Sequence, residues 1–299
     1  MNTSTDLLLL LERVFSTVFP IIAIVTAGYL YARKANPDLQ VANRINMDIF
    51  LPALIFSVMA GKSFDLYAHL DLALGSVVMV LGAGLLMKPV AKVLGIPSKT
   101  FVPPMMFNNC GNLGLPLALL AFGDAGLAAF VVMFLVSNLL HFSLGIHIVD
   151  ENAKLTGLFK NPIILSTFAG LAWALFKLPL PTWLATPIDM VGQISIPLML
   201  FALGVRMISV DLSQWKIGVY GAIFSPLSSL VFAIPFAWIM GLSDEFTAYI
   251  VLFSVLPPAV LNYMFAERYH QQPETVASIV LIGNLASLAF IPLTLFFVL

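Results

Sequence analysis

The chain has 299 residues, of which 60% are hydrophobic and 10% charged, and its mean hydropathy is +1.00. A soluble core of this size cannot hide so much apolar surface, so lipid must cover the excess. The formal net charge of −1 offers no basic surface for nucleic acid, and a single cysteine, Cys110, excludes an internal disulfide and a cysteine-cluster metal site. We therefore expect a membrane protein without metal or cofactor, whose function resides inside a helical bundle.

Apolar segments long enough to cross a bilayer follow one another along almost the whole chain. A transmembrane helix needs about 20 mostly apolar residues, and charged, Pro or Gly clusters separate ten such segments. We expect an all-α polytopic membrane protein with ten transmembrane helices and no separate soluble domain. The expected spans cover residues 14–32, 44–61, 70–94, 101–122, 126–149, 161–179, 187–206, 215–242, 246–269 and 275–299.

Lys and Arg residues are concentrated on one side of these spans. Of the 14 such residues, 11 fall in the odd-numbered connections and 3 in the even-numbered connections and the N-terminal segment. Because cytoplasmic loops carry the excess of Lys and Arg, the bias predicts a multi-pass protein of a bacterial inner membrane with both termini outside the cytoplasm. The 11 are Arg33, Lys34, Arg44, Lys88, Lys92, Lys99, Lys154, Lys160, Arg206, Lys216 and Arg268; the 3 are Arg13, Lys62 and Lys177.

A charged linker divides the chain into two halves of five spans. Residues 1–149 form the first half, 150–160 a cytoplasmic linker, and 161–299 the second half. Since five is odd, two halves with one fold enter the membrane from opposite sides and form inverted repeats. Two sequence patterns support this expectation. LPALIF at 51–56 matches IPLMLF at 196–201, and P-P-x-x-x-N occurs at both 103–108 and 257–262.

Paired prolines are expected to break spans 4 and 9. Pro103 and Pro104 lie in span 4, and Pro257 and Pro258 lie in span 9. A proline inside a helix costs about 3 kcal/mol, and backbone groups freed at membrane depth need protein partners or a wet cavity. Inverted-repeat transporters place such breaks at their binding site. The alternative is a pair of kinked helices packed tightly through Gly and Asn.

Amide side chains follow the prolines, where a lipid-facing helix would carry Leu or Val. Amides donate hydrogen bonds without a permanent charge, and half-helices that begin near the midplane turn their positive dipole ends inward. A carboxylate fits such a place, and we expect Asn108 and Asn262 to line one site. The expected binding residues are Asn108, Asn109, Gly111, Asn112, Asn262 and Tyr263, with Pro116 as a further helix-breaking residue.

Ionisable residues within the spans are few and are candidates for ion coupling. Asn138 and His141 are three residues apart and share one helix face, although a packing histidine is the alternative. Glu267 either carries a proton or pairs with Arg268 at the interface, and Asp71 either couples or reaches the interface. We favour protons over sodium as the coupling ion, and transport without a coupling ion stays open.

These residues resemble the auxin efflux carrier family, whose bacterial members are ten-span permeases. The resemblance covers essentially the whole chain. It is carried by the segment 51–56, the segment 108–116 continuing to Phe122 and Gly123, Asn138, and Pro257-Pro258 leading to Ala266 and Tyr269. The chain departs from the family in span 10, with Asn284 and Ser287 where relatives often carry Thr or Ser, and at Glu267, which stands in a stretch that is often uncharged.

The resemblance implies two bundles: a scaffold of spans 1, 2, 6 and 7, and a transport domain of spans 3–5 and 8–10 in which broken spans 4 and 9 cross. It also implies a carboxylate substrate, because bacterial relatives are associated with malonate and malate and plant relatives export auxin. A homodimer through the scaffold is possible. The expected function is secondary active transport of a small organic anion by alternating access, with the substrate at the crossover.

Three other functions are alternatives to transport of this kind. An intramembrane enzyme lacks support, because the chain has no H-E-x-x-H, no Cys or His cluster and no serine nucleophile motif. An ATP-driven pump would need a phosphate-binding loop, and Gly82-Ala83-Gly84 followed by Lys88 has the wrong spacing. An anion channel is the closer alternative, since its sequence need not differ; saturable counterflow against large unitary currents separates the two.

The Lys and Arg bias generates a test of orientation. Cysteines introduced singly near Arg33, Lys92, Lys154 or Lys216 should react with a membrane-impermeant thiol reagent only after the cells are opened, because these loops are expected in the cytoplasm. Labelling near Lys154 in intact cells would show that the orientation is reversed.

Overall fold

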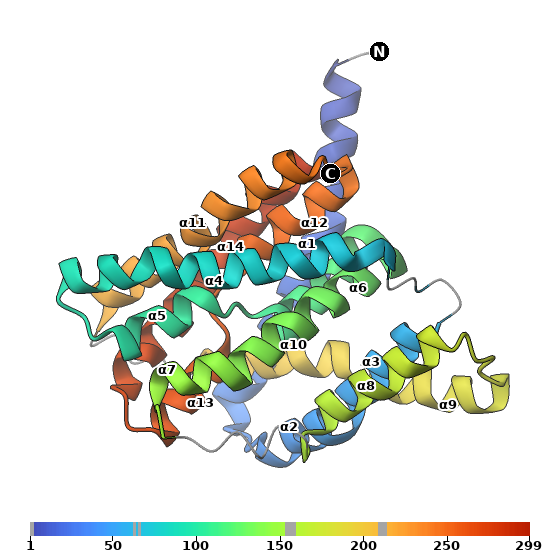
Figure 1. Ribbon diagram of the computed structural model, residues 1–299, viewed down its shortest axis with the longest axis horizontal. Coiled ribbons are helices and arrows are strands. Elements are labelled where there is room, and N and C mark those ends of the chain that lie inside the picture. The colour runs from blue at the N-terminus through green and yellow to red at the C-terminus, as the bar shows by residue number, and fades with distance from the viewer. Residues whose placement is uncertain (1–2, 62–63, 65–66, 153–159, 209–213) are drawn as a thin grey trace.

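The computed structural model describes residues 3–61, 64, 67–152, 160–208 and 214–299, and these fold into helices connected by short turns. Figure 1 shows their arrangement. The elements are α1 (Thr3–Ala35), α2 (Gln40–Ile45), η1 (Asn46–Phe50), α3 (Leu51–Ala60), η2 (Tyr67–His69), α4 (Leu70–Leu94), α5 (Ser98–Met106), η3 (Cys110–Gly114), α6 (Leu115–Leu140), η4 (His141–Gly145), α7 (Ile146–Val149), α8 (Pro162–Leu175), α9 (Thr182–Gln193), α10 (Ser195–Arg206), α11 (Trp215–Met240), α12 (Asp244–Ser254), α13 (Val260–Arg268) and α14 (Pro273–Val298).

The chain is an all-helical polytopic membrane protein. Within the described residues, 7 helical segments are long and apolar enough to cross a bilayer. They correspond to expected spans 1, 2, 3, 7, 8 and 10, and one further segment, Cys110–Val149, covers the second half of span 4 together with span 5. Expected span 6 corresponds to the shorter α8, and expected span 9 to α12 and α13, which are separated by a non-helical break.

The long segment Cys110–Val149 contains a sharp change of direction at Gly123. This glycine has φ 69° and ψ −157°, a conformation that residues with a side chain rarely adopt. The kink falls between the expected boundaries 122 and 126, so α6 comprises two helices, the end of span 4 and the start of span 5.

One group of helices packs through glycines. A side chain on Gly204 of α10 would stand 1.9 Å from the carbonyl oxygen of Val25 on α1, and one on Gly28 would stand 2.2 Å from that of Phe201. In the same way Gly192 of α9 lies against the backbone of Leu54 on α3. Small residues let backbones approach closely, which is how helices associate where lipid removes the hydrophobic driving force.

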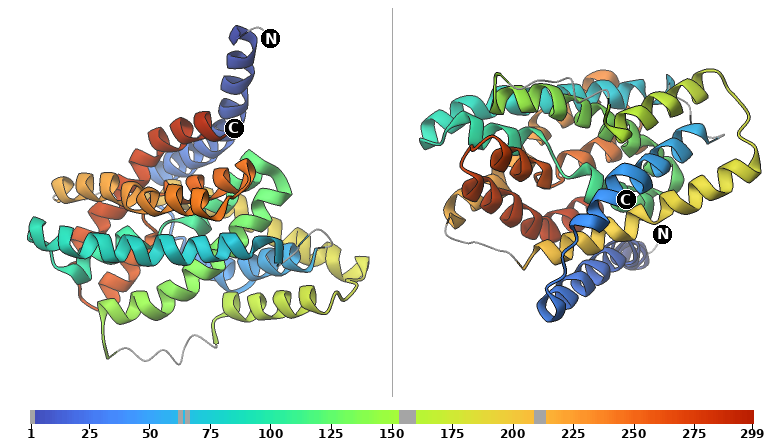
Figure 2. Two further views of the ribbon diagram at one scale, coloured as in Figure 1. Left: turned by 45° about the horizontal axis from the view of Figure 1, so that its top comes forward. Right: turned by 90° about the horizontal axis from the view of Figure 1, so that it is seen from below.

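The second group surrounds the broken helices. α11 packs against α4, α5, α12 and α14, and α13 packs against α14. Figure 1 shows α4 and α11 running beside each other, with α3, α8 and α9 gathered at one end of the bundle. The two further views in Figure 2 show the same separation. The first turns of α1 project beyond the bundle, and Arg13, further along α1, donates to the carbonyl oxygen of Leu299 at 3.1 Å.

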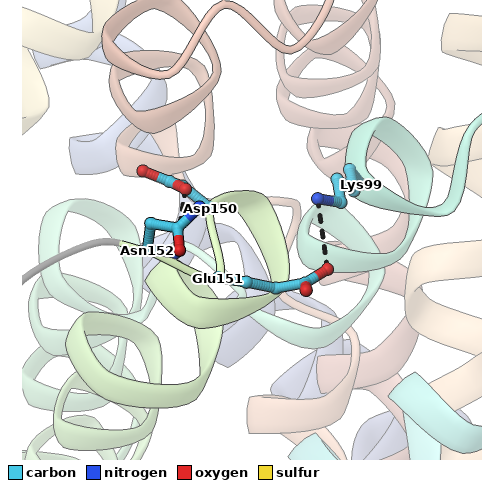
Figure 3. Close-up of polar contacts among 4 residues, drawn as sticks. All are labelled: Lys99, Asp150, Glu151 and Asn152. Carbon is cyan, nitrogen blue, oxygen red and sulfur yellow. Dashed lines mark hydrogen bonds and ion pairs between the residues drawn. The ribbon is translucent and has the colours of Figure 1, made fainter.

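An exposed ion pair lies at the start of the expected linker. Lys99, in the first turn of α5, is 3.4 Å from Glu151, and the backbone N–H of Asn152 donates to Asp150 (Figure 3). A surface pair of this kind contributes about 0–1 kcal/mol, so it connects α5 to the end of α7 without deciding the fold. Residues 153–159 of the expected linker lie outside the described part of the chain.

The close approach of α1 and α10 predicts the effect of a single added methyl group. Gly204→Ala should lower the free energy of unfolding by about 1–3 kcal/mol, because the atoms it meets are backbone atoms of Val25 and Tyr29 that cannot give way. Thermal unfolding in detergent measures this. Gly111→Ala is the control, since its nearest neighbour is a ring carbon of Phe134 at 3.1 Å, which can shift. Equal stability of both variants would contradict this packing.

Candidate functional site

The two broken helices cross and are joined there by their own backbones. After α5 ends at Met106, the backbone N–H of Asn109 donates to the carbonyl oxygen of Pro257 at 2.6 Å. In return the N–H of Ala259 donates to the carbonyl oxygen of Phe107 at 2.9 Å, so Asn108 and Pro258 form an antiparallel bridge. Each break therefore supplies the partners that the other lacks, as backbone groups at membrane depth require.

The prolines fit this bridge for a physical reason. Pro257 contributes only its carbonyl group and Pro258 contributes neither bridge hydrogen bond, so their missing N–H groups cost the bridge nothing. Pro257 also disfavours a helical conformation at Leu256, which agrees with the end of α12 at Ser254. In span 9 the break therefore lies at the proline pair, as expected.

In span 4 the expected position of the break is wrong. α5 continues through Pro103 and Pro104 and ends at Met106, where Phe107 becomes extended (φ −112°, ψ 104°). The extended conformation matters because it lets the carbonyl group of Phe107 serve span 9. The bridge pairs Asn108 with Pro258, so four residues further on Asn112 is the counterpart of Asn262. The two P-P-x-x-x-N segments are thus one helical turn out of register.

Side-chain amides complete the crossover. The amide nitrogen of Asn108 donates to the carbonyl oxygen of Phe253 at 2.7 Å, and that of Asn109 donates to the Oδ1 atom of Asn284 at 2.9 Å. Asn284 in turn donates to the carbonyl oxygen of Pro258 at 3.1 Å. Because hydrogen bonds are strong where water is excluded, these amides hold span 4, span 9 and span 10 in one arrangement.

Asn262 also holds the crossover. Its amide nitrogen donates to the carbonyl oxygens of Phe107 (2.9 Å) and Ala259 (3.0 Å), which uses both of its N–H groups. The side chain is 3% exposed and does not line the cavity described next. Of the two residues expected to line one site, Asn108 lines this cavity and Asn262 does not.

A cavity of about 570 Å³ reaches the crossover from one side. It lies between the group containing α2, η1 and α10 and the group containing η3, α6, η4 and α13. Of the expected site residues, it is lined by Asn108, Asn109, Gly111, Asn112, Asn138, His141 and Tyr263. Cavities of several hundred Å³ with a few convergent polar groups are typical of small-molecule sites.

Three π-helical turns contribute to the cavity wall. Asn46 and Met47 belong to η1, Gly111 and Asn112 to η3, and His141 to η4. Such turns are rare and occur frequently at functional sites, because they place side chains where a regular helix cannot. Their convergence on one cavity separates this cavity from ordinary gaps between helices.

Two arginines also line the cavity. Arg44, in the last turn of α2, and Arg206, in the last turn of α10, both line it. Within the described part of the chain, its lining contains no Asp or Glu. The electrostatic character is therefore positive at one wall and neutral but rich in donors at the other, which suits an anion.

His141 is held by aromatic rings at the cavity wall. It stacks on Phe107 with ring centroids 4.0 Å apart, and its edge meets Phe265 at 5.1 Å. Among the described residues the Nε2 atom of His141, the Nδ2 atom of Asn138 and the Oδ1 atoms of Asn108 and Asn262 are buried without a hydrogen-bond partner. Each such atom costs about 1–3 kcal/mol.

The remaining expected residues lie away from the cavity. Asp71 is exposed in the first turn of α4, and Pro116 is buried at the start of α6. Glu267 is exposed and accepts a hydrogen bond from the hydroxyl of Tyr263 at 2.9 Å. In the described part of the chain it makes no ion pair with Arg268, which lies over the ring of Tyr269.

Several residues of this region are not among those that the sequence patterns indicate. Asn284 was noticed only as a departure in span 10, although an amide in an apolar span is itself a signal. Arg44 and Arg206 were assigned only to the ends of spans, and no local pattern shows that two helix ends far apart in sequence line one cavity. The other polar lining residues that were missed are Gln40, Asn43, Asn46 and Ser137.

Comparison with known proteins gives two matches. Residues 151–297 match the family model described as "Membrane transport protein". The chain is 25% identical over 311 residues to a protein of Rhizobium meliloti (strain 1021) with the name "Putative malonate transporter", and the alignment covers 93% of this chain and 94% of that protein. The family model and the relative are thus both named for membrane transport.

The two amides related by the crossover should behave differently when removed. Asn262→Ala should lower the free energy of unfolding by about 1–3 kcal/mol, since it removes the donor to two carbonyl oxygens in a buried place. Asn112→Ala should change it by less than about 0.5 kcal/mol, because this half-buried side chain makes no hydrogen bond within the described residues. Thermal unfolding of both purified variants decides between them, and a reversed order would refute these roles.

Proposed function

We propose that the chain is a permease of the auxin efflux carrier family and a secondary active transporter of a small organic anion, which its similarity to a membrane transport family and to a relative named as a transporter supports. The anion binds in the cavity beside the crossing of spans 4 and 9, and alternating access carries it across the membrane. The observation that carries this proposal is the cavity itself. It reaches two broken helices from one side, and its described lining combines amide donors and arginines.

The donors at the crossover are suited to a carboxylate. η3 begins at Cys110 and α13 at Val260, and Cys110, Gly111, Val260 and Leu261 all line the cavity. The first N–H groups of a helix lack intrahelical partners and carry the positive end of its dipole, so two helix starts face the ligand together. Asn112 adds a side-chain amide. Neutral donors of this kind bind an anion weakly enough to release it.

Asn109, Asn262 and Asn284 act differently in this proposal. Their amides already bind one another or backbone carbonyls, so they position the crossover and do not donate to the ligand. A rigid crossover keeps the helix starts in place, while the amide of Asn112 adapts to the anion. Tyr263, Met264 and Phe134 provide the apolar surface for the organic part of the ligand.

The packing of the helices supports ten spans in two inverted five-helix repeats. Such a repeat exchanges span 1 with span 6 and span 2 with span 7. α1 packs on α10, which is a contact of span 1 with span 7, and α3 packs on α8, which is the equivalent contact of span 2 with span 6. We propose the halves 1–149 and 161–299, with spans 1, 2, 6 and 7 as the scaffold.

We assign the mouth of the cavity to the side rich in Lys and Arg, and that side to the cytoplasm. Arg44 and Arg206 line the cavity and belong to the ends of spans that the charge bias places on that side. Leu115 and Leu117 do not line the cavity and are fully buried in one apolar cluster with Leu54. This is an inward-facing state, and transport requires the apolar seal to open as the cavity closes.

Protons are the coupling ion that we favour. His141 lies at the cavity wall against the crossover, and Glu267 is one hydrogen bond away from Tyr263, which lines the cavity. Both residues can therefore sense the state of the site. A homodimer through the scaffold also remains part of the proposal, resting on the resemblance alone.

The proposed function is tested by counterflow in proteoliposomes. Vesicles preloaded with an unlabelled dicarboxylate should accumulate labelled dicarboxylate, with saturation, and Asn112→Ala should weaken the apparent affinity about tenfold while the protein still folds. An imposed pH gradient should drive net flux, and His141→Ala or Glu267→Gln should change that response.

Leu184→Ala, on a helix outside the cavity, is the matched control and should leave affinity unchanged. Large unitary currents without counterflow would establish an anion channel instead. Strict dependence on sodium with indifference to pH would overturn proton coupling alone.

A further inference from the structure

A buried amide, that of Asn46, lies in the wall of the cavity that α2, η1 and α10 form. Asn46 is the first residue of η1, where the regular helix α2 gives way to a π-helical turn. It lines the cavity although only 4% of the residue is exposed. Polar side chains inside membrane spans are rare and usually have a function, so we asked what this amide does.

A second buried residue fixes the direction of this amide. The hydroxyl of Ser195, at the start of α10, donates to the Oδ1 atom of Asn46 at 2.8 Å. Ser195 is 0% exposed and does not line the cavity, so the amide oxygen is turned away from the cavity and the Nδ2 atom faces it. Among the described residues, the bond from Ser195 is the one side-chain hydrogen bond of Asn46. Both N–H groups of the amide are therefore left for water or a ligand.

The fold of the span does not require an amide at this position. Segments 51–56 and 196–201 match in sequence, and extending the match towards the N-terminus pairs Asn46 with Val191. The equivalent span of the second half thus carries an apolar residue there. A buried hydroxyl and amide that bind each other can be replaced by two apolar side chains of similar shape at little cost in stability. Packing alone therefore does not explain why Asn46 and Ser195 are polar.

We propose that Asn46 is a further anion-binding residue, whose Nδ2 atom donates a hydrogen bond to the substrate, and that Ser195 is its positioning residue. This inference rests on the proposed function, because it concerns the same cavity. Asn46 belongs to the proposed scaffold, whereas Asn112 belongs to the group of helices that contains the crossover. An anion held from both sides loses the contact with Asn46 when the two groups move during alternating access, so the bound anion favours the state described here.

Three variants separate binding from packing. Asn46→Asp keeps the acceptor for Ser195 and replaces the donor that faces the cavity with an oxygen, so it should weaken anion binding on the order of tenfold or more. The double variant Asn46→Leu and Ser195→Ala removes both partners, so it should keep its stability and bind the anion on the order of tenfold more weakly. Ser195→Ala alone should weaken binding about threefold, because the amide stays but is no longer held in place.

Calorimetric titration of the purified full chain with malonate and with succinate measures these affinities, and thermal unfolding without ligand measures the stability of each variant. Asn36→Asp is the matched control. Asn36 follows α1 with φ 41°, which Asp also tolerates, and it lines the adjoining hollow of about 260 Å³ but not the main cavity. Because Asn36 is exposed and salt screens the added charge, affinity should stay within about twofold of the wild type.

The outcomes bear separately on Asn46 and on the proposed function. If the double variant folds and binds both anions as the wild type does, Asn46 only packs against α10 and the inference is overturned, while an anion site at the crossover stands. The same holds if Asn36→Asp loses as much affinity as Asn46→Asp. If the double variant does not fold, unchanged affinity of Asn46→Asp overturns the inference. If the wild-type chain binds neither anion, the proposed function fails together with it.

Discussion

The structure depends on one constraint: backbone groups freed inside a membrane must find partners within the protein. Spans 4 and 9 are both interrupted, and each interruption supplies a carbonyl group and an N–H group to the other through the bridge of Asn108 and Pro258. Neither break is stable without the other. The same bridge places the starts of η3 and α13 side by side. The unpaired backbone N–H groups of two helix starts therefore lie close together.

The amides around this bridge divide into two kinds. Those of Asn109, Asn262 and Asn284 have protein partners and fix the crossing, whereas Asn112, the counterpart of Asn262, faces the cavity. Asn112 and Asn262, which are equivalent about the Asn108–Pro258 bridge, therefore have different roles. This asymmetry is what a one-sided cavity requires: in a state open to one side of the membrane, the two halves cannot have the same environment.

The charges that line the cavity come from α2 and α10 and not from the crossover. α10 ends at Arg206, where the helix dipole favours a cation, whereas Arg44 lies in α2, which continues into η1 and α3 without a break. At the crossover itself the donors are neutral. The described lining is therefore cationic at Arg44 and Arg206 and neutral at the crossover.

The sequence by itself determined the membrane character, the extents of most spans, the interruption of spans 4 and 9, and half of the polar residues that line the cavity, because hydropathy, prolines and intramembrane amides are local signals. It misplaced the break in span 4, since helix α5 tolerates Pro103 and Pro104, and only a partner from span 9 makes the extended conformation of Phe107 favourable. The sequence also does not show that Asn112 lines the cavity whereas Asn262 does not. Nor does it show that Arg44 and Arg206 line the same cavity. These were decided by tertiary structure, because they depend on which segments distant in sequence meet and which donors those contacts use up.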